Sequence, residues 1–199
     1  MRGQAAVASA PRGRRGIPGA FVSAFLLGTT CLLLAGCQIG GVHAPSETPP
    51  PRGSSARLVN YISDQPFVTA DSGYRAIYTL AKNAEFTGDF PELTQTLSSD
   101  GLIGKDWNYS ADRCLDRASV GFMVCRACRI QSGLNWMLTG LGRYAWRELQ
   151  YKDIAGPGSE YATMSGGEFV GLLLRAEDYL ERTGKTEVPK TQLGRREAQ

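Results

Sequence analysis

Residues 165–184 read SGGEFVGLLLRAEDYLERTG. Ser165 and Glu168 have the spacing of a capping box, in which the two side chains bond backbone N–H groups at a helix start. Apolar residues then recur at the intervals of one helix face: Phe169, Leu172, Leu173, Ala176 and Leu180. Gly184 is typical of the position just after a helix end. This segment therefore predicts a long amphipathic helix and favours a mainly α-helical fold.

Four further helices are expected before this one. They cover about residues 72–84, 90–99, 111–130 and 133–151. Asp71 is the expected N-cap of the first, and Asp89 with Glu92 repeats the capping-box spacing at the second. In the fourth, one apolar face is expected to hold Leu134, Leu138, Leu141, Ala145 and Leu149. Residues 152–164 contain Gly-Pro-Gly and predict a loop, and only residues 58–62 suggest the alternation of a strand.

Composition agrees with one small domain and flanking segments. The chain has 199 residues, of which 42% are hydrophobic and 21% charged, as in ordinary globular proteins. We predict a single domain of about five helices over residues 58–182, followed by a polar tail over 183–199. The net charge of +3 arises in residues 1–36, which hold four of the 22 basic residues and none of the 19 acidic ones. The remainder is nearly neutral, so we predict no nucleic-acid partner.

The N-terminal segment has the pattern of an export signal. Arg12, Arg14 and Arg15 precede an uncharged apolar stretch over residues 20–35. A membrane-spanning helix needs about 20 apolar residues, so this stretch is short for a span and typical of a secretory signal peptide. Two alternatives remain open, an uncleaved anchor helix and a secretory signal without lipidation.

The apolar stretch ends in Leu34-Ala35-Gly36-Cys37, which resembles the lipobox of bacterial lipoproteins. The resemblance implies cleavage between Gly36 and Cys37 and attachment of acyl chains to Cys37. It also implies an extracytoplasmic protein whose partner is the membrane, through the lipid anchor. Gln38 stands where an Asp would mean inner-membrane retention, so the outer membrane is favoured if Gram-negative sorting applies. Pro, Gly and Ser dominate the following residues, and we predict a lipidated Cys and flexible linker over 37–57.

Three cysteines lie in the predicted domain: Cys114, Cys125 and Cys128. On an unbroken helix all three share one face, but the rise of 1.5 Å per residue places Cys114 about 16 Å from Cys125. A break at Gly121 would bring them closer together. Three roles stay open, namely core packing, a structural disulfide, and a metal or thiol-redox site. A haem attachment site is disfavoured because Arg129 stands where a histidine is required.

Other chemically active residues give weaker patterns. The only histidine, His43, lies in the linker, so the domain has no Ser-His-Asp or Cys-His set. A carboxylate pair for hydrolysis could come from Glu85, Asp89, Glu168 and Glu177. A basic patch is formed by Arg113, Arg117, Arg126 and Arg129. A solvated or ion-paired helix face is the favoured interpretation of this patch, and the alternative is that Arg126 and Arg129 flank a groove and hold an anion. Trp136, Tyr144, Trp146 and Tyr151 fit either a core or a surface that touches the envelope.

These patterns favour a membrane-anchored exported lipoprotein with a non-catalytic binding or structural role at the cell envelope. Its expected partners are an envelope protein or a cell-wall polymer, and no cofactor is predicted. One alternative is a thiol-redox or metal-binding envelope protein that uses Cys125 and Cys128, with or without Cys114. The other is a carboxylate-dependent cell-wall hydrolase.

Overall fold

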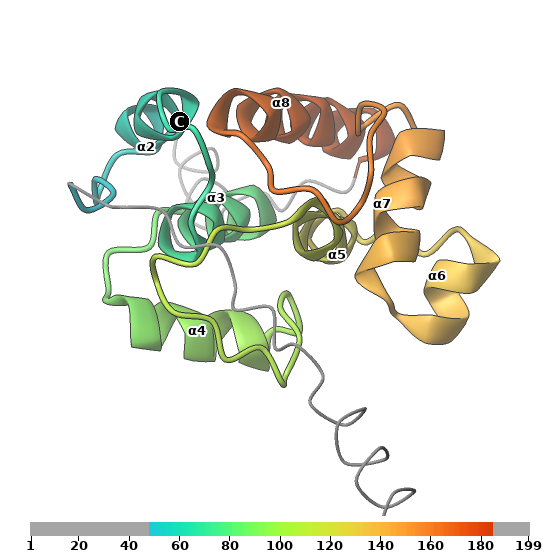
Figure 1. Ribbon diagram of the computed structural model, residues 1–199, viewed down its shortest axis with the longest axis horizontal. Coiled ribbons are helices and arrows are strands. Elements are labelled where there is room, and N and C mark those ends of the chain that lie inside the picture. The colour runs from blue at the N-terminus through green and yellow to red at the C-terminus, as the bar shows by residue number, and fades with distance from the viewer. Residues whose placement is uncertain (1–47, 185–199) are drawn as a thin grey trace, which may run out of the picture. The chain divides into compact units, whose positions relative to one another are not determined.

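The computed structural model describes residues 48–184 of the chain. This part contains seven α-helices joined by loops (Figure 1). They are α2 (Ser55–Ser63), α3 (Ala70–Lys82), α4 (Phe90–Ser99), α5 (Arg117–Ala127), α6 (Leu134–Thr139), α7 (Gly142–Tyr151) and α8 (Gly166–Thr183). The mainly α-helical fold is confirmed. The expected signal peptide, Cys37, His43 and most of the polar tail lie outside the described residues. None of the helices in the described range is both long and apolar enough to cross a membrane.

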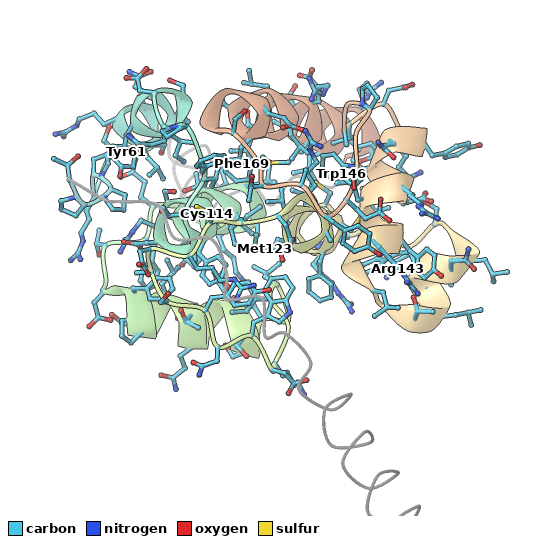
Figure 2. All side chains as sticks on the ribbon, viewed as in Figure 1. Tyr61, Cys114, Met123, Arg143, Trp146 and Phe169 are labelled. Carbon is cyan, nitrogen blue, oxygen red and sulfur yellow. The ribbon has the colours of Figure 1, made fainter. Side chains whose placement is uncertain are left out.

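The core lies among α2, α3, α5, α7 and α8. In Figure 1, α3 and α5 lie side by side, with α4 on one side of α3 and the pair α2 and α8 on the other. Tyr74 of α3, Trp146 of α7 and Phe169 of α8 are the largest side chains fully buried between these helices. Figure 2 shows Trp146 and Phe169 pointing inward from their separate helices. Burial of apolar surface is the main favourable term in folding, and aromatic side chains each bury a large area.

The helices with the clearest local signals form as expected. Ser165 caps α8 by accepting a hydrogen bond from the Glu168 N–H, and Gly184 ends the helix in the left-handed conformation. Asp89 caps α4 in the same way, through the N–H of Glu92. The helix then closes with a bond of 2.9 Å from the Leu102 N–H to the Leu97 carbonyl, as in a Schellman motif. Residues 152–164 form a loop, as predicted.

The strand expected at residues 58–62 is wrong, because this segment belongs to α2. Leu58 and Ile62 are its two buried residues, and their spacing of four fits both a strand face and a helix face. Ser54 decides between them as the N-cap, since its hydroxyl accepts a bond from the Arg57 N–H. At the start of α3 the cap is Thr69 and not Asp71, which instead binds Arg75 one turn later.

The helix expected over residues 111–130 begins later, at Arg117. Residues 113–115 are extended and bond to neighbouring segments, with the Leu115 N–H donating to Val68 (2.9 Å) and the Arg113 carbonyl accepting from Ala70 (2.8 Å). Asp116 then caps α5 through the Ser119 N–H at 2.7 Å. Cys114 therefore lies before the helix, and the expectation that it shares a helix face with Cys125 is wrong.

The single helix expected over residues 133–151 is two helices. Gly140 adopts a φ of +63°, a left-handed conformation that glycine allows without strain, and it ends α6. Leu141 is extended, and α7 begins at Gly142. A Cβ atom at Gly142 would collide with the Ala118 carbonyl oxygen of α5, so this glycine permits close packing of the two helices. Gly140 thus breaks the helix, and Gly142 lets α7 approach α5 closely.

Candidate functional site

An open groove of about 530 Å³ lies where the C-terminal ends of α3, α4 and α5 meet α6. Its charged and aromatic lining consists of Lys82, Asp100, Arg126, Arg129 and Trp136, with Met137 at the edge. We call this cavity the α6 groove. Its volume falls in the range of pockets that bind small molecules or peptide segments. The groove is the candidate binding site.

Trp136 forms the rigid wall of the α6 groove. It is the buried residue of α6, and its indole N–H donates to the Ile130 carbonyl at 3.0 Å. Its ring meets Phe122 of α5 edge to face, with centroids 5.5 Å apart and an angle of 87° between the rings. The Arg126 guanidinium lies over both rings, at 5.2 Å from Phe122 and 5.3 Å from Trp136. These cation–π contacts hold a charged but solvent-exposed group at the mouth of the groove.

Charges in the α6 groove nearly cancel. Lys82 pairs with Asp100 at 3.3 Å, and Arg126 and Arg129 leave the lining side chains with an excess of positive charge. Against this, α3, α4 and α5 all end here, and each helix end carries roughly half a negative charge. The interior is thus polar without a strong net charge. It suits a neutral or zwitterionic ligand better than a multiply charged anion.

Of the predicted basic patch, Arg126 and Arg129 line the groove. Arg126 is in the last turn of α5, whereas Arg129 lies beyond the end of the helix in a left-handed conformation with a φ of +52°. Arg117 instead binds Glu168 with two hydrogen bonds, at 2.8 and 3.0 Å, which join α5 to α8. Arg113 lies over the Tyr109 ring at 4.0 Å. A bound anion at Arg126 and Arg129 stays one of the two alternatives for this patch.

The three cysteines have buried positions. The Cys125 thiol donates to the Ala145 carbonyl at 3.6 Å, and the Cys128 thiol is 4.0 Å from the Ala176 carbonyl. No disulfide joins cysteines in residues 48–184. Burial raises the pKa of Cys125 far above its ordinary value, and burial with the neighbouring Asp112 carboxylate raises that of Cys114. A thiolate is the form that attacks disulfides and binds metals, so this environment favours core packing for Cys125.

The four carboxylates considered for hydrolysis do not line the α6 groove. Glu85 accepts two bonds from Ser55, at 2.6 and 2.7 Å, and Asp89 caps α4. Glu168 binds Arg117, and Glu177 is exposed on α8. Burial, followed by the nearby Glu181 and Asp178, raises the pKa of Glu177. Within the described range there is also no group of three His, Cys, Asp or Glu side chains that could hold a metal ion.

Sequence reasoning missed part of the site. Lys82 and Asp100 reach the groove from the ends of two other helices, which only the tertiary fold brings to α5. Three leucines assigned to the core face of one helix are exposed: Leu134, Leu138 and Leu141. The break at Gly140 turns them away from the face that Ala145 and Leu149 bury. Trp136 and Trp146 are core residues, whereas Tyr151 is 83% exposed.

No protein-family model, curated protein sequence or solved structure matches this chain.

Proposed function

We propose that the protein is a lipid-anchored, extracytoplasmic component of the bacterial envelope that binds a partner without catalysis. The α6 groove carries the binding part of this proposal, because it combines a rigid aromatic wall with four charged side chains at the ends of three helices. The Leu34-Ala35-Gly36-Cys37 sequence supports the anchor. Two or three acyl chains on Cys37 would hold the chain at a bilayer, since each buried CH₂ contributes about 0.8 kcal/mol.

The chemistry of the groove favours binding over reaction. Its carboxylate, Asp100, is paired with Lys82, and its thiol, Cys125, is 1% exposed and held protonated by burial. The remaining polar side chains are those of Lys82, Arg126, Arg129 and Gln131, which can orient a ligand by hydrogen bonds. A neutral or zwitterionic segment of an envelope protein or of a cell-wall polymer fits this balance of charge.

The anchor is tested by growth of the bacterium with radiolabelled fatty acid. We expect label in the wild-type protein and in a Cys31→Ala variant, whose cysteine lies in the signal segment. We expect none in the Cys37→Ala variant. Label that survives in the Cys37→Ala variant, or wild-type protein without label, would contradict the anchor.

The groove is tested by a photoreactive amino acid placed at Gln131, which lines it, and at Asn60 of α2 as the matched exposed control. Irradiation of intact cells should yield a discrete envelope adduct at position 131 and not at position 60. Equal adducts at both positions would mean that the groove has no special affinity for an envelope component.

A further inference from the structure

Four large apolar side chains are exposed on α6 and at the residue that leads into α7. They are Leu134 (72% exposed), Met137 (65%), Leu138 (75%) and Leu141 (45%). We call these four residues the α6 stripe. Single exposed leucines are ordinary, but here four large apolar side chains are exposed within eight residues, and apolar patches mark surfaces that meet a partner or a membrane.

The attachment of α6 to the domain directs the stripe outward. Trp136 fixes the inner face of α6 through its ring contacts and its bond to Ile130. A helix turns about 100° per residue, so Leu134 and Leu138, each two residues from Trp136, lie about 160° from it. Figure 1 shows α6 at the margin of the domain, beyond α7. The stripe therefore faces away from the core.

The segment that carries the stripe is strongly basic. Residues 117–152 contain six Lys or Arg residues and one acidic residue, Glu148. Glu148 is buried, and its carboxylate accepts a bond from Ser132 (2.6 Å) and lies 3.5 Å from the Lys152 ammonium group. The other described residues contain eight basic and fifteen acidic side chains. Two of the six, Arg117 and Arg147, pair with Glu168 and Glu160 from outside the segment. The positive charge near α6 therefore comes mainly from the remaining arginines, among them Arg126 and Arg143.

Two exposed arginines lie near α6. Arg126 lies over the Trp136 ring, on the groove side of α6. Arg143 lies in the first turn of α7, with its guanidinium 4.8 Å from the centre of the Tyr144 ring, and Figure 2 shows it projecting beside α6. Within residues 48–184 neither forms a salt bridge with a carboxylate. Both can therefore contact phosphate groups while the stripe contacts an apolar phase.

We propose that the α6 stripe docks on the surface of an anionic phospholipid bilayer. In this arrangement Leu134, Met137, Leu138 and Leu141 enter the boundary between headgroups and acyl chains, and Arg126 and Arg143 contact lipid phosphates. Exposed apolar groups beside cations are the features by which interfacial helices bind such membranes. Charge complementarity favours this occupant over a second copy of the chain, because two basic surfaces would repel each other. The proposal rests on the proposed function, because the envelope location is what brings the protein to a bilayer.

The test reads the depth of individual side chains in vesicles. Full-length protein with Cys31 and Cys37 replaced by alanine is given a single new cysteine, Leu138→Cys, and an environment-sensitive dye is attached to it. The matched control is Leu174→Cys on α8, another exposed leucine (58%). The parent without a new cysteine measures background labelling of the buried thiols. The vesicles contain phosphatidylcholine alone or an equal mixture with phosphatidylglycerol, and the acyl chains are brominated to quench nearby dyes.

We expect the dye at position 138 to be quenched at least twice as strongly as the dye at position 174 in the anionic vesicles. Exchange of Arg126 and Arg143 for glutamate should abolish this difference, whereas Arg57→Glu on α2 should leave it intact. Equal quenching at positions 138 and 174 in anionic vesicles would overturn the proposal. Quenching at position 138 that is as strong in neutral as in anionic vesicles would overturn it too. A dye at 138 that is shielded without vesicles, in a protein that sediments as a dimer, would identify a second copy as the occupant and overturn it too.

Failure here is distinguishable from failure of the anchor. The vesicle experiment uses a chain that cannot be lipidated at Cys37, and the apolar N-terminal segment is the same in every variant. Docking of the stripe would therefore be seen even if fatty-acid labelling shows no anchor. Its absence would leave a positive labelling result unchanged.

Discussion

Gly121 lies where α5 crosses α7, and no other residue fits there without displacement of a helix. A Cβ atom at this position would be 2.9 Å from the Trp146 backbone nitrogen and 3.0 Å from its Cα. These are backbone atoms and cannot rotate away. Gly167 on α8 offers the contrast, because a Cβ there meets nothing within 4 Å.

We expect Gly121→Ala to lower the free energy of unfolding by about 1–3 kcal/mol, the usual effect of overpacking. Gly167→Ala should raise it by about 0.5–1 kcal/mol, because alanine loses less conformational entropy in a helix. Urea unfolding monitored by circular dichroism measures both. A Gly121→Ala variant as stable as the wild type would show that α5 and α7 are farther apart than described.

Tyr74 carries a hydroxyl that folding leaves unsatisfied. The side chain is fully buried and its ring stacks on Phe90 at 5.7 Å, yet its oxygen has no hydrogen-bond partner among residues 48–184. Burial raises the pKa of Tyr74 well above its ordinary value, so the hydroxyl is neutral at any physiological pH. The ring contributes to the core and the oxygen costs desolvation energy.

Tyr74→Phe is therefore expected to keep stability unchanged or to raise it by up to about 1 kcal/mol. The control is Tyr109→Phe, which removes a bond of 3.3 Å to Ser119 and should cost about 0.5–1.5 kcal/mol. Thermal unfolding of the two variants compares them directly. A clear loss of stability in Tyr74→Phe would mean that the hydroxyl has a partner after all.

At the scale of elements, the start of α2 is hydrogen-bonded to the carboxylate of Glu85, 30 residues further along the chain. Glu85 follows α3 and accepts bonds from the backbone N–H and the hydroxyl of Ser55, the first residue of α2. The Ser55 hydroxyl, and then its N–H, lower the pKa of Glu85 below its ordinary value of 4.5. Ionised Glu85 thus stabilises the native state.

The sign of this effect predicts a pH dependence. Because the pKa is lower in the folded state, the stabilisation is complete above pH 4.5 and is lost as the pH falls through the folded value. We expect Glu85→Gln to be less stable than the wild type at pH 7, with a difference that shrinks towards pH 3. Urea midpoints across this range measure it, with Asp106→Asn as an exposed control. A difference that grows at low pH would contradict the assignment.

The elements also show what a sequence pattern can and cannot predict. α4 and α8 form where expected because their end signals are local. Asp89 and Ser165 bond backbone N–H groups three residues away, and Gly184 directly follows the end of α8. The start of α5 depends on pairing of residues 113–115 with residues far along the chain, which no local pattern contains. Arg126 could be placed near one face of α5 from the helix pattern, but Arg129 could not, because α5 ends at Ala127 and Arg129 is left-handed. Lys82 and Asp100 could not, because their approach depends on how three helices pack.

At the scale of the whole molecule, basic residues and exposed apolar side chains occur together in the segment that contains α6. The α6 stripe lies in the one basic segment of the described domain, and the α6 groove opens beside it and shares Met137. A protein tethered to a bilayer by acyl chains needs only weak further contacts to adopt a fixed orientation, because tethering raises the effective concentration of the surface. Docking through the stripe would bring the mouth of the groove close to the headgroups.

The proposed lipid anchor is the premise of this arrangement, and intact-mass spectrometry of the protein extracted from membranes tests it most directly. The account predicts a chain that begins at Cys37 and is heavier than its amino-acid mass by a diacylglycerol group, with or without a third acyl chain. A chain that begins at any other residue, or one that begins at Cys37 without added acyl mass, would contradict it.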